Sequence, residues 1–395
     1  MTDRDRMLAA IRGEAPDRLP WVPRLEFWYR AQSRNGTLPP ELRGLSLIEI
    51  ADRLGCGYYS VIPDYTAGTG ELDMIDRAIG IYRLPVLPYR VMLDGVERKI
   101  VSRGRETVVE YHTPLGSVRT TAIFSEEMLD AGASTPHTSE CAIKGPVDFD
   151  VLGYIFSHAR VEPQSEGDLA QRRFVGDRGI VVAYVHGAAC PIHHILKYLM
   201  PLDQFFYAFH DYPEKVERLI AEMEPFYAAM KACAAQSAAE VILLGANYDD
   251  SITYPPFFRR HILPVLRDYA AALHLQGKFL LTHTDGENRR LLPMLAEAGF
   301  DVADSVCPHP MTSVTLDEFL TAFEGRTTVL GGIPAILLCR DSATDDDCRR
   351  YIDGLMERHG RRTRFILGVS DMVTADADWD RLRRITERVT APAAG

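Results

Sequence analysis

The chain has 395 residues and a net charge of -11, and 46% of its residues are hydrophobic, an ordinary balance for a globular protein. No basic block stands out, so nucleic acid is not an expected partner, and no apolar run approaches the roughly 18 residues that span a bilayer. The N-terminus is charged, without a signal-peptide core, and the seven cysteines include no CxxC pair. We therefore expect a cytoplasmic protein with reduced thiols and no membrane partner.

The predicted elements begin with two helix and strand pairs, over 3–12, 18–25, 47–54 and 58–63. The pattern changes between 82 and 124, where residues alternate around turn pairs such as Asp94-Gly95. Such a pattern predicts antiparallel hairpins. We interpret this stretch as an insertion into the main architecture rather than as a domain with its own core.

After the insertion, apolar strands alternate with amphipathic helices. Strands are predicted over 180–185, 241–245, 279–281, 301–306, 328–332 and 364–368. This alternation predicts a parallel sheet with helices on its faces. Together with the two earlier strands the count is eight, which favours a closed (β/α)8 barrel over an open sheet, and we expect 1–395 to form a single domain.

The most informative motif follows the apolar run 279–281, where the chain reads His283-Thr284-Asp285-Gly286 before a predicted helix. In parallel α/β proteins, binding and catalytic groups collect at this end of the strands. Residues two apart on a strand face the same side, so His283 and Asp285 could serve one metal or one acid/base pair. They could equally satisfy each other, with Asp285 capping the helix.

Other polar residues fall at predicted strand ends, which a barrel brings onto one rim: Glu26, His186, Asn247, Asp249 and Cys307. His186 is a candidate general base, or else a satisfied structural histidine. Asn247 and Asp249 are candidates for substrate contact, with local capping as the alternative. The Cys307 thiolate is a possible metal ligand, and a buried thiol in a Pro-rich turn is the alternative reading.

Aromatic residues lie beside the same strand ends: Trp28, Tyr65, Tyr184 and Tyr248. An aromatic-lined cleft with a few polar groups suits a planar small molecule, and packing at the rim is the alternative. Gly331-Gly332 is a strand end rather than a phosphate loop, and the sequence contains no nucleotide-binding glycine pattern.

Three further stretches, together with this motif, resemble the uroporphyrinogen decarboxylase superfamily. Residues 4–20 resemble its opening helix, a Gly-x-x-x-Asp-Arg turn and its first strand, and 143–149 resemble the segment that re-enters the barrel. The His283 motif, followed by 291–301, resembles the family's His-x-Cys-Gly strand and next helix. The Gly368 region resembles the last strand. The resemblance implies a (β/α)8 barrel with its cleft at the C-terminal rim.

Two departures separate the chain from the best-defined branches of that superfamily. The decarboxylases carry Arg-Gln-Ala-Gly-Arg after the first strand, whereas Arg24 and Arg30 here flank aromatic residues and Glu26. Porphyrinogen decarboxylation is therefore not expected. The methyltransferases hold zinc with His-x-Cys and a second Cys. Asp285 replaces the first of these, and Asp371 stands near the position of the second.

The His-x-Asp-Gly pattern resembles the branch that demethylates ethers of small aromatic compounds. The resemblance implies a methyltransferase whose acceptor is a corrinoid on a separate protein, because no cobalamin-binding domain is visible in the chain. Zinc is the implied cofactor, and the predicted ligands are His283 and Asp285 of the motif, with Cys307 as a possible third. The predicted catalytic residues are His283, Asp285, Glu26 and His186. The predicted substrate contacts are Arg24, Trp28, Tyr65, Tyr184, Asn247, Tyr248 and Asp249.

Two other functions stay open at this point. The first is a metal-independent lyase acting on a small carboxylic acid, with the carboxylate held by Arg24. The second is a barrel that binds a ligand without turnover, which the missing Cys ligands allow. The sequence leaves the substrate and the oligomeric state open, a homodimer included.

Overall fold

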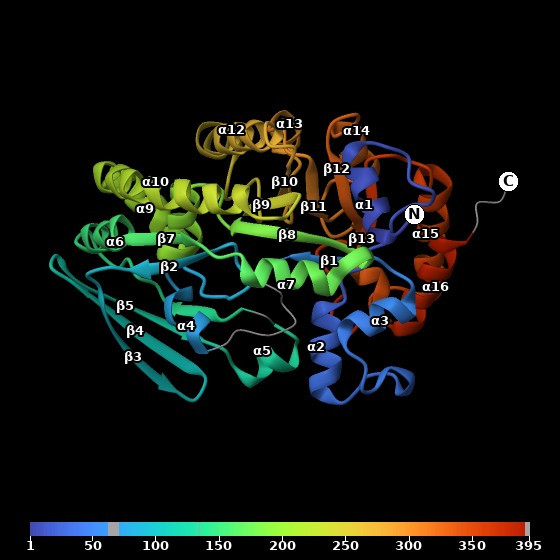
Figure 1. Cartoon of the computed structure of the whole chain (residues 1–395), viewed down its shortest axis with the longest axis horizontal. Coiled ribbons are helices and arrows are strands. Elements are labelled where there is room, and N and C mark those ends of the chain that lie inside the picture. Colours follow the sequence, from blue (N-terminus) through green and yellow to red (C-terminus); the bar gives the residue numbers. More distant parts are fainter. Residues whose placement is uncertain (62–70, 134, 392–395) are drawn as a thin grey trace.

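The computed structural model describes residues 1–61, 71–133 and 135–391. Its centre is a curled parallel sheet of seven strands in the order β1-β8-β9-β10-β11-β12-β13 (Figure 1). These strands are Tyr58–Val61, Gly179–His186, Val241–Ala246, Phe279–His283, Val302–Val306, Thr328–Ile333 and Phe365–Val369. The strands after the insertion lie close to their predicted positions, because each is a short apolar run between helices.

The first predicted strand is reduced to a single bridge between Trp21 and Leu367 of β13. Val22 N–H donates to the Leu367 carbonyl at 2.8 Å, and Leu367 N–H donates to Pro20 at 2.9 Å. On the other side, Gly57 N–H donates to Trp21 at 2.8 Å, just before β1. Prolines interrupt this segment and cannot donate to a ladder, so it stays short. It nevertheless joins the two edges of the sheet, an arrangement compatible with a TIM-like barrel.

Helices follow most of the strands and cover the outer face of the sheet (Figure 1). The α-helices outside residues 71–163 are α1 Asp3–Arg12, α2 Glu26–Asn35, α3 Leu47–Leu54, α7 Glu166–Val175, α8 Pro191–His194, α9 Leu202–Asp211, α10 Pro213–Gln236, α11 Pro255–Phe257, α12 Leu263–His274, α13 Leu292–Glu297, α14 Leu316–Ala322, α15 Asp345–His359 and α16 Trp379–Thr390. Short 3-10 turns are Pro40–Leu42, Gly176–Arg178 and Ala335–Leu338, and π-helical turns are Ile195–Leu199 and Phe258–Ile262.

Between β1 and β8 the chain builds antiparallel structure. Strands β3 Glu97–Arg103, β4 Glu106–Thr113, β5 Gly116–Ile123 and β6 His137–Glu140 form a four-stranded sheet, and β2 Tyr89–Leu93 pairs with β7 Ala159–Pro163. Helices α4 Glu71–Arg77, α5 Glu126–Asp130 and α6 Asp148–Ser157 accompany them. The antiparallel strands thus continue past residue 124, because β6 and β7 return to pair with the predicted hairpins.

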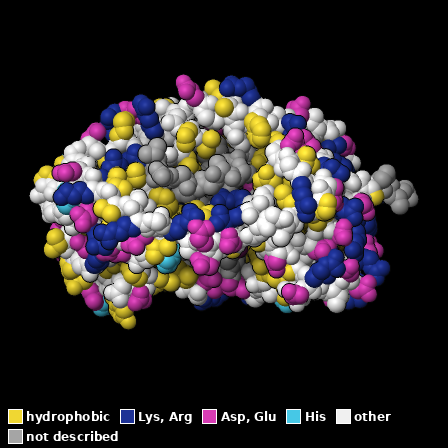
Figure 2. Space-filling model, turned by 90° about the horizontal axis from the view of Figure 1, so that it is seen from below, with side chains coloured by type: hydrophobic (Ala, Val, Ile, Leu, Met, Phe, Trp, Pro, Cys, Tyr) yellow, Lys and Arg dark blue, Asp and Glu magenta, His cyan; other side chains and the backbone are white. Residues whose placement is uncertain are grey.

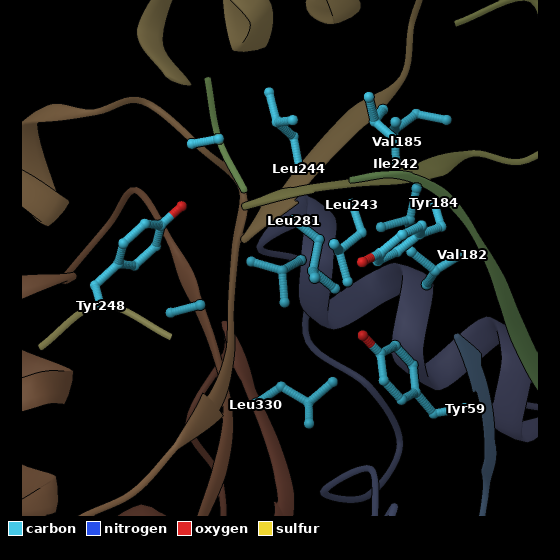
Figure 3. Close-up of a cluster of buried hydrophobic side chains, with 14 of the residues drawn as sticks. Tyr59, Val182, Tyr184, Val185, Ile242, Leu243, Leu244, Tyr248, Leu281 and Leu330 are labelled. Atoms are coloured by element: carbon cyan, nitrogen blue, oxygen red, sulfur yellow. The ribbon is translucent and has the colours of Figure 1, made fainter. Parts of the chain in front are cut away.

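The main core fills the inside of the curled sheet and the layer under its helices. Successive residues of β9 point to opposite faces, Leu243 inward beside Leu281 and Leu244 outward (Figure 3). All residues of β8 are buried, as expected for a strand covered on both faces. Within the part of the chain that the structure describes, no helix is both long and apolar enough to cross a membrane.

Candidate active site

A cleft of about 600 Å³ lies at the carboxyl ends of the parallel strands. Residues at strand ends line it, among them Gly187, Asn247, His283, Asp304 and Asp371. Its size suits a small organic molecule. Figure 2 shows the molecule from below, with basic and acidic side chains side by side near the middle of that face.

The polar centre of the cleft is a His–Asp pair on adjacent strands. His283 of β10 and Asp304 of β11 occupy paired positions, and His283 Nδ1–H donates to Asp304 Oδ2 at 2.9 Å. Burial acts to lower the pKa of His283, but the bond to Asp304 and the charge of Asp371 outweigh it, so its pKa is raised. The pair therefore favours a charged imidazolium on the wall of the cleft.

Arg24 completes this centre from the segment that closes the sheet. Its Nη1 lies 3.7 Å from Asp304 Oδ2 and 3.5 Å from Asp371 Oδ1, and the same Asp371 oxygen is 3.6 Å from His283 Nε2. Burial opposes the charge of Arg24, yet the two carboxylates raise its pKa above the ordinary value. Burial likewise acts to raise the pKa of Asp304, but His283 and Arg24 hold it low. Arg24 is therefore already engaged by two carboxylates.

Asn247 and Asp285 lie beside this centre, at the ends of β9 and β10. Asn247 adopts a left-handed backbone conformation with φ 58°, and its Nδ2 donates to Asp285 Oδ2 at 3.4 Å. Its Oδ1 accepts from Lys197 Nζ at 3.2 Å. Burial raises the pKa of Asp285, with His283 acting against the rise. The structure thus brings three predicted residues, Asn247, His283 and Asp285, into one neighbourhood.

One wall of the cleft is aromatic. Tyr184, a predicted substrate contact, lines it, and its hydroxyl donates to Tyr82 at 3.1 Å; the Tyr82 and Tyr198 hydroxyls are 2.8 Å apart. Phe27 also lines the cleft, whereas its neighbour Trp28 is buried, stacked on another indole with ring centroids 5.3 Å apart. Trp28 therefore packs the core instead of facing the cleft.

His186 lies below the cleft rather than on its surface. It is fully buried, its Nε2–H donates to the Gly80 carbonyl at 2.8 Å, and its Nδ1 accepts from Ala188 N–H at 2.9 Å. Burial lowers its pKa to about 3, and its ring stacks on His194 at 4.5 Å. With both nitrogens engaged, this geometry does not support the predicted role as a general base.

Several other predicted residues lie away from the cleft surface. Tyr248 is buried, with its hydroxyl 2.8 Å from Thr282 Oγ1, and Asp249 Oδ1 accepts from Ser251 N–H at 2.8 Å within its own turn. Glu26 is buried at the start of α2, where its charge acts on Arg24. Tyr65, predicted to contact substrate, falls outside the described residues.

The predicted zinc ligands do not gather around one point. Cys307 is buried, and burial raises the pKa of its thiol to about 11. His283 Nδ1 is bonded to Asp304, which leaves Nε2 as the ring nitrogen that could bind a metal. Among residues 1–61, 71–133 and 135–391, no three His, Cys, Asp or Glu side chains are placed to hold a metal ion. The donors as placed do not fit a zinc site.

Sequence reasoning missed Asp304, Lys197 and Tyr82 as cleft residues. Asp304 had a signal, since it is the one charged residue within an otherwise uncharged buried strand, and such residues are usually paired. Lys197 follows two histidines in a short helical stretch, without a recognisable motif. Tyr82 lies in the irregular region before β2, so only the tertiary structure places it there.

The fold and the cleft define an α/β protein of the TIM-like class with a polar site at the carboxyl ends of its strands. Residues 184–391 match the family described as uroporphyrinogen decarboxylase (URO-D), so the chain belongs to this family. The solved structure of a methyltransferase from Methanosarcina mazei is similar over 98% of each chain, with a TM-score of 0.51 and 14% sequence identity. A comparison with curated proteins finds no match.

Proposed function

We propose that this protein is a methyltransferase that moves a methyl group from a small methoxylated aromatic compound to a corrinoid carried by a separate protein. Family membership and a fold shared with a methyltransferase support the general reaction class. In this proposal the fold is a (β/α)8 barrel with an antiparallel insertion after its second strand, and the site lies at the C-terminal rim. The corrinoid, when bound, supplies the nucleophile.

The observation that carries the proposal is the orientation of His283. Its Nδ1 is bonded to buried Asp304, so Nε2 is left for a group in the cleft, beside Asp371. When the bond between methyl carbon and oxygen breaks, its electron pair stays on the oxygen, and the Nε2 proton passes to that oxygen. A neutral phenol then leaves. Stabilising charge on the departing oxygen in this way lowers the barrier.

Zinc stays a prediction in this proposal, because the resemblance implies it while the placed donors do not fit it. Elemental analysis of purified wild-type protein beside His283→Ala tests it. Stoichiometric zinc that is lost in the variant would identify His283 as a ligand. In the acid mechanism, activity survives dialysis against a chelator.

The test of the function is methyl transfer itself. Methoxybenzene labelled in its methyl carbon is incubated with Co(I) cobalamin, with the protein and, as a control, without it. The label is followed from the ether to the cobalamin. We expect equal amounts of phenol and methylated cobalamin. Release of carbon dioxide from a carboxylic acid without any methyl acceptor would instead support a lyase. That alternative needs another residue to hold the carboxylate, because Arg24 is engaged by Asp304 and Asp371.

A further inference from the structure

Lys197 lies on the wall of the cleft but takes no part in its polar centre, which His283, Asp304, Asp371 and Arg24 form. It belongs to the π-helical turn Ile195–Leu199 that follows α8 and lines the cleft. Single π-helical turns are frequent at functional sites, because they shift the direction of a side chain relative to a regular helix. The turn places the Lys197 ammonium between the ends of β8 and β9.

The Lys197 ammonium is held by uncharged oxygens. Nζ donates to the carbonyls of Gly187 at 3.2 Å and Ala246 at 2.9 Å, and to Asn247 Oδ1 at 3.2 Å. Asp285 is near enough to stabilise the charge, but the amide of Asn247 stands between the two groups. Among the residues that the structure describes, Lys197 forms no ion pair. These oxygens use all three N–H groups of the ammonium, so a ligand carboxylate would replace Asn247 Oδ1, the one side-chain acceptor, and pair with the ammonium charge.

The polar centre, in contrast, already pairs its cationic side chains with carboxylates of its own. His283 and Arg24 face the carboxylates of Asp304 and Asp371, and the carboxyl groups of Glu26 and Asp285 also interact with these two cations. An anionic substrate group placed there would meet two carboxylates. The Lys197 end of the cleft is the better position for such a group, and it lies beside Tyr198, with Nζ 5.9 Å from the ring centroid.

We propose that Lys197 binds the carboxylate of an aromatic substrate whose ring packs against the tyrosine wall of the cleft. The inference rests on the proposed function, since it names the class of substrate that the same site takes. With the carboxylate at Lys197, the other end of the ring extends toward His283, where the ether oxygen would accept a proton. Burial lowers the pKa of Lys197 to about 8, so the ammonium remains charged at pH 7.

The test compares two ligands of the same shape, 4-methoxybenzoate and 4-methoxybenzamide, by isothermal titration calorimetry at pH 7. The wild type should bind the benzoate about tenfold more tightly or better, as a charge-assisted hydrogen bond in a partly dry site requires. Lys197→Met should remove this preference, and Lys197→Arg should restore part of it. Equal binding of the two ligands by the wild type, or no binding of the benzoate, would overturn the proposal.

Lys278→Met is the matched control. Lys278 also donates to two backbone carbonyls, of Ser237 at 2.6 Å and Ala239 at 2.7 Å, but just before β10, at the opposite end of the sheet. The Lys278→Met variant should keep the wild-type preference for the benzoate. Turnover with Co(I) cobalamin is measured separately. Selective binding without methyl transfer would contradict the proposed function alone, and methyl transfer without selectivity would contradict the anion site alone.

Discussion

His283 Nδ1 lies 2.9 Å from Asp304 Oδ2, and the two residues occupy paired positions on the parallel strands β10 and β11. The backbone register of the sheet therefore sets this contact, not the conformation of a loop. A proton donor fixed in this way needs little reorganisation during a reaction, which favours catalysis by a preorganised group.

Replacing His283 should remove the proton donor. For His283→Gln we expect kcat to fall by a factor of about 10² to 10⁴, the usual contribution of a general acid. The matched control is His274→Gln, since His274 Nε2 also contacts an aspartate, Asp301, at 2.9 Å, outside the cleft. Steady-state kinetics of phenol release measure both variants. A His283→Gln enzyme with wild-type kcat would contradict the acid role.

The pH dependence of kcat should report the raised pKa of His283. As pH rises through this pKa, which lies above the ordinary 6.5, the imidazolium loses its proton and kcat should fall. In Asp304→Asn the hydrogen-bonded carboxylate is gone, so the pKa of His283 drops and the fall in kcat moves to lower pH. A pH profile that is unchanged in Asp304→Asn would separate His283 from the titrating group.

Removing Arg24 should cost stability. In Arg24→Met, the buried carboxylate of Asp304 loses a neighbouring cation, and breaking a buried ion pair costs about 3 kcal/mol or more of the free energy of unfolding. Arg90→Met is the control, because its pair with Glu162 is exposed and such pairs contribute about 1 kcal/mol or less. Urea unfolding measures both. Equal losses in the two variants would show that the Arg24 pairs are not stabilising.

His186 should affect stability rather than chemistry. His186→Gln disturbs the bonds to Gly80 and Ala188 and the stack on His194, so we expect about 1–3 kcal/mol less stability. Activity per folded molecule should stay near that of the wild type. Thermal unfolding and kinetics on the same preparation test this. A stable variant that had lost kcat would favour the catalytic role that the sequence suggested.

The period of the apolar residues was enough to place most strands of the parallel sheet and to put His283, Asp285 and Asn247 at the carboxyl ends of those strands. That information is local, because a run of apolar residues between helices marks a buried parallel strand whatever its neighbours are. The motif at His283 was found for the same reason. The first strand was overestimated, since its prolines limit it to the bridge at Trp21.

The partners of these residues depended on tertiary structure. Asp304 meets His283 through the register of two strands, and Arg24 reaches both carboxylates only because the chain closes the curled sheet. Phe27 faces the cleft, whereas Trp28 faces the core. Successive residues of a helix point about 100° apart around its axis, and composition does not reveal which of the two faces the cleft. Strand periodicity determines which face a side chain takes, whereas register, closure and helix phase determine what it touches, and these are set by packing across the whole curled sheet and its helices.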